Sequence, residues 1–177
     1  YCKPQGITAL AEKVVTKVKN VRQGPPTYQK WIRHHLPGKA ELEKQRKTTF
    51  GYNPKISFVV PLYKTPEKYL RRLVESLQEQ TYSNWELCFS DGSGAESPLT
   101  DLLKELSAKD KRIKYVSHDE ALQISENTNS AIEIAAGDFI AFADHDDELT
   151  PNALFECVKA LNDRPQTLVI YTDEDKM

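Results

Sequence analysis

The 177-residue sequence is poor in cysteine and contains no long apolar segment. Its three cysteines, Cys2, Cys88 and Cys157, are odd in number and lack the close spacing of a metal site. We therefore expect buried free thiols, which suits a reducing cytoplasm. No apolar stretch approaches the ~18 residues that a membrane-spanning helix needs. These absences disfavour disulfide scaffolds and integral membrane proteins, and favour a globular domain with its own core.

The net charge is also small, −2 at pH 7, but it conceals a division along the chain. Residues 1–53 carry 11 Lys/Arg and 3 Asp/Glu, whereas residues 54–177 carry 13 and 23. This balance predicts a basic leader over 1–53 and an acidic domain over 54–177. The leader is either a solvated helical segment or a docking surface for anionic lipid, an acidic partner or the chain's own acidic half. The charge of the acidic domain disfavours nucleic acid.

Apolar spacing predicts the secondary structure. In the leader, helical periodicity covers residues 7–21, 28–36 and 40–48. From residue 55 onward, short apolar runs alternate with amphipathic helical stretches. Strands are predicted over 56–60, 85–89, 113–116, 139–143 and 168–171, and helices over 66–80, 98–106, 126–136 and from 151. Alternation of this kind predicts an α/β fold with a mostly parallel sheet, helices on both faces, and a helical segment in front.

Polar residues follow several of the predicted strands directly. Tyr63 follows the first strand, Asp91 the second, and the run 144–147 the fourth. Because the carboxyl ends of parallel strands meet at one edge of a sheet, these groups are expected to face one ligand. Asp173 follows the fifth predicted strand and lies either at the same edge or in a solvated turn.

The acidic run Asp144, Asp146 and Asp147 is the strongest of these signals. Crowded carboxylates repel one another unless a cation lies among them, and Mg²⁺ or Mn²⁺ takes oxygen ligands while keeping water and phosphate in its shell. A solvated acidic turn ahead of a helix is the alternative. An EF-hand is disfavoured, because Leu149 stands where its glycine would be and Phe155 where its glutamate would be.

The other loops support a nucleotide ligand less specifically. Asp91 is suited to accept the imide N–H of uracil or thymine, or forms an ordinary turn with Gly92. Tyr63 either stacks on a base or covers the end of the sheet. Asn127 and Asn129 either form hydrogen bonds within the segment ahead of the fourth strand or contact the ligand.

Residues 55–177 resemble the family two inverting glycosyltransferases with a GT-A (Rossmann-like) fold. The resemblance is carried by residues 56–63 (ISFVVPLY), 80–93 (QTYSNWELCFSDGS) and 137–147 (GDFIAFADHDD), in the family's order. The DHDDEL run at 144–149 and the YTDEDK run at 171–176 are similar to those of bacterial enzymes that build rhamnan and other surface polysaccharides.

The resemblance implies roles for individual residues. Pro61 and Tyr63 would border the base, Asp91 would bind the uracil or thymine imide, and Asp144 would approach the ribose. Asp146, with Asp144, would hold Mg²⁺ or Mn²⁺ on the diphosphate. The further candidates are Asp147, Asn129 and Asp173. Three departures leave the donor open: Ser90 replaces an acid, Lys64 replaces an asparagine, and residues 127–129 (NTN) replace Ala-Arg-Asn.

The resemblance also implies a reaction. A sugar would pass, with inversion, from a UDP- or dTDP-sugar to a growing cell-surface polysaccharide or a lipid-linked acceptor, in the cytoplasm, with the leader on the inner membrane face. The general base is expected beyond Met177, so we expect the donor-binding half alone, with little transferase activity.

Three other functions are alternatives to this reaction. One is a catalytically inactive nucleotide-binding or interaction module. A sugar nucleotidyltransferase is disfavoured because residues 61–65 hold no glycine-rich phosphate loop. A receiver domain is disfavoured because no acid pair follows the first strand.

Overall fold

A computed structural model describes residue 32 and residues 35–172 of the chain. The chain divides into two compact units, Tyr1–Gly38 and Lys39–Met177, and every element named below belongs to the second. The helices predicted over 7–21 and 28–36 fall almost wholly outside the described residues. In the described part of the chain, no helix combines the length and the apolar character that crossing a membrane requires.

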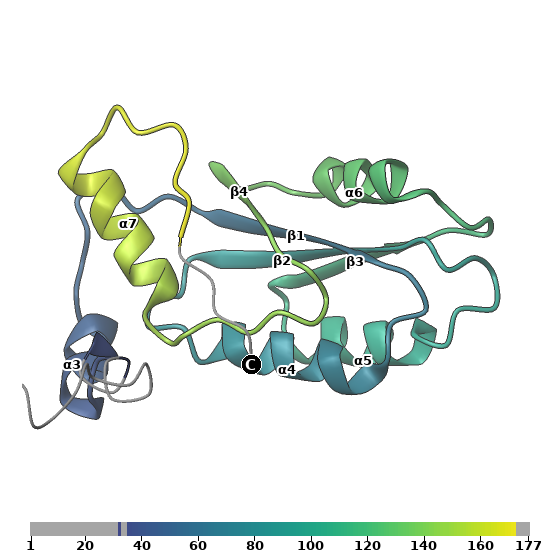
Figure 1. Cartoon of the computed structure of the whole chain (residues 1–177), viewed down its shortest axis with the longest axis horizontal. Coiled ribbons are helices and arrows are strands. Elements are labelled where there is room, and N and C mark those ends of the chain that lie inside the picture. The colour runs from purple at the N-terminus through teal and green to yellow at the C-terminus, as the bar shows by residue number, and fades with distance from the viewer. Residues whose placement is uncertain (1–31, 33–34, 173–177) are drawn as a thin grey trace, which may run out of the picture. The chain divides into compact units, whose positions relative to one another are not determined.

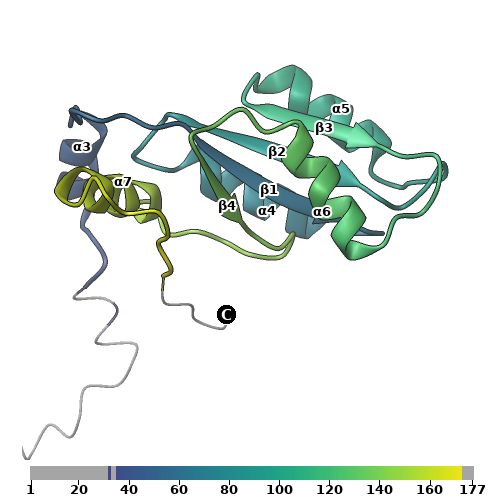
Figure 2. The same cartoon turned by 90° about the horizontal axis from the view of Figure 1, so that it is seen from above.

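A four-stranded parallel sheet forms the centre of the second unit (Figure 2). The strands lie in the order β3-β2-β1-β4, so β1 and β2 are central and β3 and β4 lie at the edges. Both central strands are buried along nearly their whole length, as expected for parallel strands that are covered on both faces. Their bounds are β1 (Ile56–Leu62), β2 (Trp85–Asp91), β3 (Ile113–Ser117) and β4 (Phe139–Phe142).

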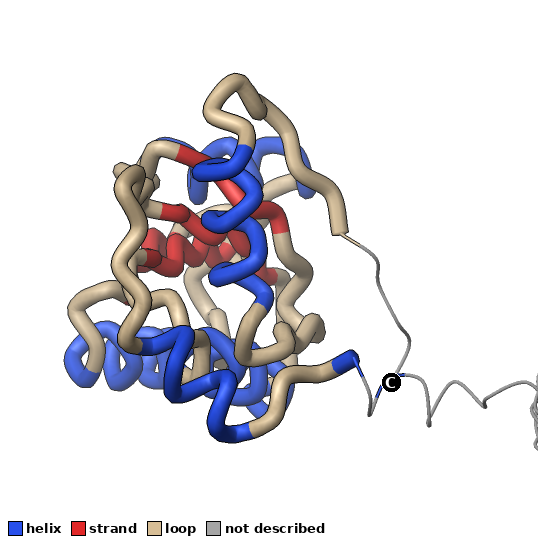
Figure 3. Tube along the Cα trace, turned by 90° about the vertical axis from the view of Figure 1, so that its left-hand side faces the viewer, coloured by secondary structure: helices blue, strands red, loops and turns tan. Residues whose placement is uncertain are grey.

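Helices cover both faces of the sheet, as predicted. Figure 1 shows α4 (Glu67–Gln78) and α5 (Thr100–Lys109) on one face and α6 (Ile124–Glu133) on the other. The strands form a layer between these helices when the unit is viewed from its end (Figure 3). The last helix, α7 (Ala153–Asp163), follows the loop after β4. The predicted α/β fold class is therefore confirmed.

The second unit begins earlier than the boundary at residue 53 that the charge pattern predicts. Its first helix, α3 (Lys39–Arg46), matches the helix predicted over 40–48. Gln45 on α3 is buried, and its Oε1 accepts a hydrogen bond from the Thr81 hydroxyl at 3.0 Å. The Phe50 ring packs against Phe155 of α7 at a centroid distance of 5.1 Å. These contacts explain why α3 groups with the sheet rather than with Tyr1–Gly38.

The apolar core lies between the sheet and the two helices α4 and α5. Alternate residues of β1 and β2 point into it, and the amphipathic stripe of α4 meets them. Each fully buried leucine contributes about 1.5–3 kcal/mol relative to an exposed one. Fully buried members include Val60, Leu62, Leu70, Leu73, Leu77, Leu87, Phe89 and Leu103.

The opposite face, under α6, contains a buried charge. The carboxylate of Glu86 on β2 contacts Lys55 Nζ at 2.6 Å and Lys114 Nζ at 3.0 Å. It also accepts hydrogen bonds from Ser57 Oγ at 2.7 Å and the Ala136 N–H at 2.5 Å. Burial raises the pKa of Glu86, but the hydrogen bonds from Lys55, Ala136, Ser57 and Lys114 outweigh it and lower the pKa to about 2. Charge and hydrogen bonds therefore stabilise this face.

The prediction of a fifth strand over 168–171 is wrong. The structure gives these residues no regular conformation, and Leu168, Val169 and Tyr171 are 86%, 81% and 93% exposed. The apolar, β-branched pattern is that of a strand, but a strand exists only where a partner supplies its ladder of hydrogen bonds. None of the described strands pairs with this segment.

The thiol prediction is confirmed for Cys88, which is free and buried on β2. Burial and the nearby charge of Glu86 raise the pKa of this thiol to about 11, so it stays protonated at neutral pH. Cys157 is free and half-buried, and Cys2 lies outside the described residues.

Candidate functional site

The loops after β1, β2 and β4 reach the same edge of the sheet, the one formed by the carboxyl ends of the strands. This follows because β2 and β4 both run parallel to β1, which lies between them. Leu62, the last residue of β1, pairs with Asp91, the last of β2. Phe142, the last of β4, pairs with Val59 two residues before Pro61. Asp144, two residues beyond Phe142, therefore lies on the other side of β1 from Asp91.

Asp91 is almost fully buried, with 1% of its surface exposed. Its Oδ1 accepts a hydrogen bond from the Ser93 N–H at 3.1 Å, and its Oδ2 accepts one from the Ser97 hydroxyl. Ser93 Oγ in turn accepts the Lys64 N–H at 2.8 Å, which ties this turn to the loop after β1. The sequence located Asp91 correctly at a strand end but did not reveal these partners.

Tyr63 extends from the loop after β1 with 52% of its surface exposed. The Lys64 ammonium lies 5.3 Å from the centroid of its ring. Lys64 has a φ of 47°, in the left-handed region that residues with side chains rarely adopt. Pro61, which lies on β1 just before this loop, is partly exposed. The loop therefore presents an accessible aromatic face beside a cation, which suits stacking of a base.

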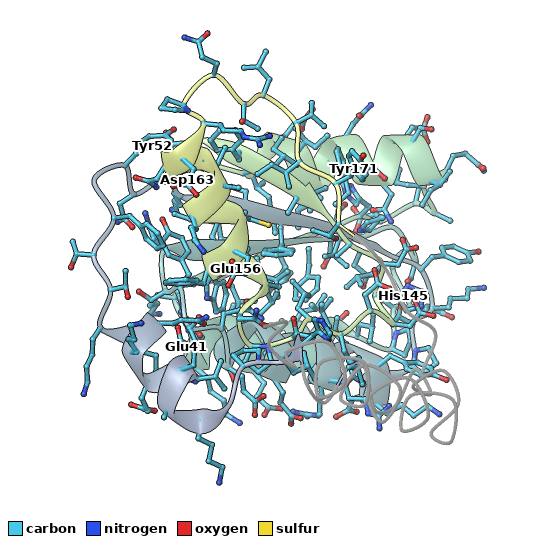
Figure 4. All side chains as sticks on the ribbon, turned by 60° about the vertical axis from the view of Figure 1, so that its left-hand side comes forward. Glu41, Tyr52, His145, Glu156, Asp163 and Tyr171 are labelled. Atoms are coloured by element: carbon cyan, nitrogen blue, oxygen red, sulfur yellow. The ribbon has the colours of Figure 1, made fainter. Side chains whose placement is uncertain are left out.

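The acidic loop follows β4. Asp144, Asp146 and Asp147 are exposed, and His145 between them is half-buried. The Asp144 N–H donates to Asp147 Oδ2 at 2.8 Å, and the Asp147 N–H donates to the Asp144 carbonyl at 3.2 Å. In Figure 4 the loop, marked by His145, lies on the side of the sheet away from Tyr52, which precedes β1. One oxygen of Asp147 is thus used within the loop, whereas Asp144 and Asp146 project carboxylates into solvent.

These carboxylates can supply part of a cation's coordination shell. Among residues 32 and 35–172, no group of three His, Cys, Asp or Glu side chains is arranged to hold a metal ion. Two exposed carboxylates still fit Mg²⁺ or Mn²⁺, because these ions take oxygen ligands and Mg²⁺ usually keeps waters and substrate phosphates in its shell.

The two candidate asparagines have different surroundings. Asn127 lies on α6 and is buried, and its Nδ2 donates to the Leu62 carbonyl at 2.8 Å. Its bond therefore runs to β1, not within the segment ahead of β4 as the sequence suggested. Asn129 lies on the same helix and is exposed. Asp173 lies outside the described residues.

Sequence reasoning missed His118, which directly follows β3 at the same edge of the sheet. Its Nε2 lies 3.1 Å from Ser90 Oγ on β2 and 3.0 Å from Ser130 Oγ on α6. This contact joins α6 to β2 next to Asp91. The available signal was its position two residues beyond the strand predicted over 113–116.

A parallel sheet with polar loops at the carboxyl ends of its strands defines an α/β protein that binds its ligand at that end. The chain belongs to glycosyl transferase family 2, whose family model matches residues 57–173. The family and the fold implied by the sequence motifs are thus confirmed.

The sequence relatives are longer proteins. The chain is 27% identical over 174 residues to the O-antigen biosynthesis protein RfbC of Myxococcus xanthus, covering 97% of this chain and 14% of RfbC. It is 33% identical over 99 residues to the UDP-Glc:alpha-D-GlcNAc-diphosphoundecaprenol beta-1,3-glucosyltransferase WfgD of Escherichia coli, covering 56% of this chain and 38% of WfgD. The chain thus spans well under half the length of these relatives.

Solved structures support the fold. TarS 1-349 of S. aureus in complex with UDP-GlcNAc gives a TM-score of 0.56 at 24% identity, over 63% of this chain and 32% of TarS. The mannosyltransferase PcManGT of Pyrobaculum calidifontis, in complex with GDP-Man and Mn²⁺, gives 0.55 at 18% identity, over 71% and 39%.

Proposed function

We propose that this chain is the donor-binding portion of a metal-dependent, inverting glycosyltransferase that uses a UDP- or dTDP-sugar. The observation that carries the proposal is the meeting of three loops at one sheet edge, with Asp91 and Asp144 on either side of β1. One loop offers an aromatic face, one a buried carboxylate, and one a pair of exposed carboxylates. A base, a ribose and a diphosphate require groups of these kinds.

Base recognition is assigned to Asp91 and Tyr63. Uracil and thymine carry an imide N–H that a carboxylate accepts, whereas cytosine has no donor at that position. Each carboxylate oxygen can accept two hydrogen bonds. The Ser97 hydroxyl occupies Oδ2, so an imide N–H joins it there or displaces it. The exposed ring of Tyr63 would stack on the base, with Pro61 beside it.

Diphosphate binding is assigned to the acidic loop. Asp146 and Asp144 would hold the cation, and Asp144 would also approach the ribose. A bound Mg²⁺ or Mn²⁺ would neutralise the charge that develops on the departing diphosphate. Asp147 holds the loop in shape through its bond to the Asp144 N–H. The complex of PcManGT with GDP-Man and Mn²⁺ supports a cation in a protein of this fold.

The proposed acceptor is a growing polysaccharide or a lipid-linked sugar. This class is suggested by the relatives, because RfbC is named for O-antigen biosynthesis and WfgD for a diphosphoundecaprenol acceptor. A catalytically inactive nucleotide-binding module would have the same donor site, so a transfer assay on the longer protein separates the two.

Nucleotide titration tests the donor site. We expect UDP to bind more tightly with Mn²⁺ than without it, and Asp146→Ala to lower the affinity in Mn²⁺ more than about tenfold, because a charge-assisted metal ligand is lost. Asp101→Ala, at an exposed position on α5, is the matched control and should bind like the unmodified chain. Equal UDP affinity with and without Mn²⁺, or tighter binding of ATP than of UDP, would contradict the proposal.

A further inference from the structure

The last carbonyl of β1 is held by two donors from different elements. The Leu62 carbonyl accepts the Gly92 N–H at 3.0 Å and Asn127 Nδ2 at 2.8 Å. A carbonyl oxygen has two lone pairs, so its hydrogen-bonding capacity is filled. Through this atom, α6 is joined to the end of β1 and to the turn that follows Asp91.

Asn127 and Gly92 are also matched in shape. A Cβ atom at Gly92 would lie 2.9 Å from both Cγ and Nδ2 of Asn127, and 3.1 Å from its Oδ1. Glycine is therefore needed at residue 92 for the close approach of the amide. The turn packs directly on the Asn127 side chain, so the position of Gly92 at the end of β1 depends on that side chain.

The Asn127 amide is only half satisfied. Its side chain is 2% exposed, and Oδ1 has no hydrogen-bond partner among the described residues. A buried acceptor without a partner is destabilising, so an apolar residue would fill this position at less cost to the fold. The orphaned oxygen indicates that the amide serves the geometry of the turn rather than stability alone.

The turn that rests on Asn127 carries the proposed base-binding carboxylate. The Ser93 N–H holds Asp91 Oδ1, and the Leu122 N–H donates to the Gly92 carbonyl at 3.0 Å. A shift of Gly92 toward a smaller residue at position 127 would therefore displace Asp91. Because an imide bond to a buried carboxylate depends on its placement, such a shift weakens recognition of uracil in particular.

We propose that Asn127 is a positioning residue that sets nucleobase preference by fixing the turn 91–93 against the end of β1. This inference rests on the proposed function, and it adds a specificity determinant outside the residues that touch the base. Its signature is a change in the ratio of UDP to CDP affinity, because CDP shares the ribose and diphosphate but lacks the imide donor.

The test measures UDP and CDP affinities, with Mn²⁺, for the full chain and for Asn127→Ala and Asn127→Asp. We expect each variant to bind UDP about tenfold more weakly, the equivalent of one net hydrogen bond, and CDP less than about threefold more weakly. Asn127→Asp keeps the volume and replaces the donor by a carboxylate oxygen, so it remains informative if the alanine variant folds poorly; its added charge acts alike on UDP and CDP, which share the diphosphate. Wild-type UDP to CDP ratios in both variants would overturn the inference.

A double substitution tests the steric match. Gly92→Ala should weaken UDP binding at least about tenfold, since its Cβ meets the amide. Gly92→Ala combined with Asn127→Ala should restore UDP affinity to within about threefold of Asn127→Ala alone, because the space is then free. Simple addition of the two losses would contradict the inference.

Asn162→Ala is the matched control. Asn162 Nδ2 also donates to backbone carbonyls, of Tyr52 at 2.8 Å and Val158 at 2.9 Å, but ahead of β1 and on α7. Its loss should lower the melting temperature and leave the UDP to CDP ratio unchanged. A changed ratio in this control would show that stability alone moves the readout, against the inference. Failure of the unmodified chain to bind UDP at all would instead overturn the proposed function, and this inference with it.

Discussion

Glu86 shows at the residue scale why one strand's pattern can mislead. In the sequence, β2 alternates apolar and polar residues, which is typical of a strand with one face in water. In the structure, Glu86 and Ser90 on the polar side are buried, because α6 and the segments around it cover that face. Whether a carboxylate lies in solvent or under a helix depends on partners that are distant in sequence, such as Lys55 and Ala136. The pattern of residues around Glu86 does not specify these partners.

The charge of Glu86 predicts how stability depends on pH. Its pKa is about 2 in the folded protein, against an ordinary value of 4.5. A lowered pKa stabilises the fold fully above about 4.5, and this contribution is lost as the pH falls toward 2. The shift corresponds to about 3 kcal/mol at neutral pH. Replacing Glu86 by Gln should lower the free energy of unfolding by about this amount at pH 7, measured by urea denaturation.

The same measurement at lower pH separates charge from packing. The difference between the unmodified protein and Glu86→Gln should shrink as the pH falls from about 5 to 2, because the Glu86 carboxylate takes up its proton in the unfolded chain near pH 4.5 and in the folded protein only near pH 2. Glu75→Gln, on the exposed side of α4, should change neither the stability nor its slope with pH. A difference that stays constant across this range would mean that shape, not charge, is what Glu86 contributes.

The site residues show a similar limit. The sequence predicted Tyr63, Asp91 and Asp144 at one edge because each follows an apolar strand, and the parallel topology bears out this placement. Their roles in binding stay predictions. The contacts of Ser97 with Asp91 and of His118 with Ser90 join segments whose approach only the folded chain determines.

At the scale of elements, strands and helices with strong periodicity were predicted well. The four strands of the sheet lie within two residues of their predicted bounds. Helices were less exact at their ends: α6 starts and ends earlier than predicted, and α7 begins two residues later. The segment 168–171 failed because its pattern describes a surface suited to pairing and cannot supply the partner.

The connection from α6 to β4 gives a prediction about an element boundary. A Cβ at Gly137 would lie 2.5 Å from Ser57 Oγ and 2.6 Å from the Lys55 carbonyl oxygen. The Gly137 N–H also donates to Ser57 Oγ at 2.8 Å. Replacing Gly137 by Ala should therefore lower the free energy of unfolding by about 2–3 kcal/mol through overpacking. Urea denaturation gives this value directly.

Gly51→Ala is the control for that substitution. A Cβ at Gly51 would meet only Asn162 Oδ1, at an ordinary 3.9 Å. Its stability should stay within about 0.5 kcal/mol of the unmodified chain. An equal loss in both variants would argue against the close contact at Gly137 as the cause.

At the scale of the whole chain, the uneven charge gives a testable expectation. The basic residues of 1–53 suit attraction to anionic lipid, and each lysine near such a surface is worth about 1 kcal/mol. Replacing Lys13, Lys17 and Lys19 by alanine should weaken binding to vesicles containing phosphatidylserine at least about tenfold, as measured by vesicle co-sedimentation. Unchanged binding would remove the membrane hypothesis and favour a solvated segment.

A second triple substitution controls for net charge. Lys68, Lys104 and Lys111 are exposed residues of the second unit, and replacing them by alanine removes an equal number of positive charges from a different part of the chain. This variant should bind the vesicles much as the unmodified chain does. Equal weakening by both triples would indicate that total charge alone governs adsorption.

The two sides of the sheet should also differ in how they accept sequence change. The apolar side consists mainly of leucine and phenylalanine side chains, and each can be exchanged for another apolar side chain of similar volume. Under α6 the contacts come as fitted pairs: Asn127 with Gly92, Gly137 with Ser57, and Glu86 with its lysines. During evolution, single substitutions should be tolerated on the apolar side. On the α6 side, a substitution of one residue should require a compensating substitution of its partner. Covariation between positions should therefore concentrate on the α6 side.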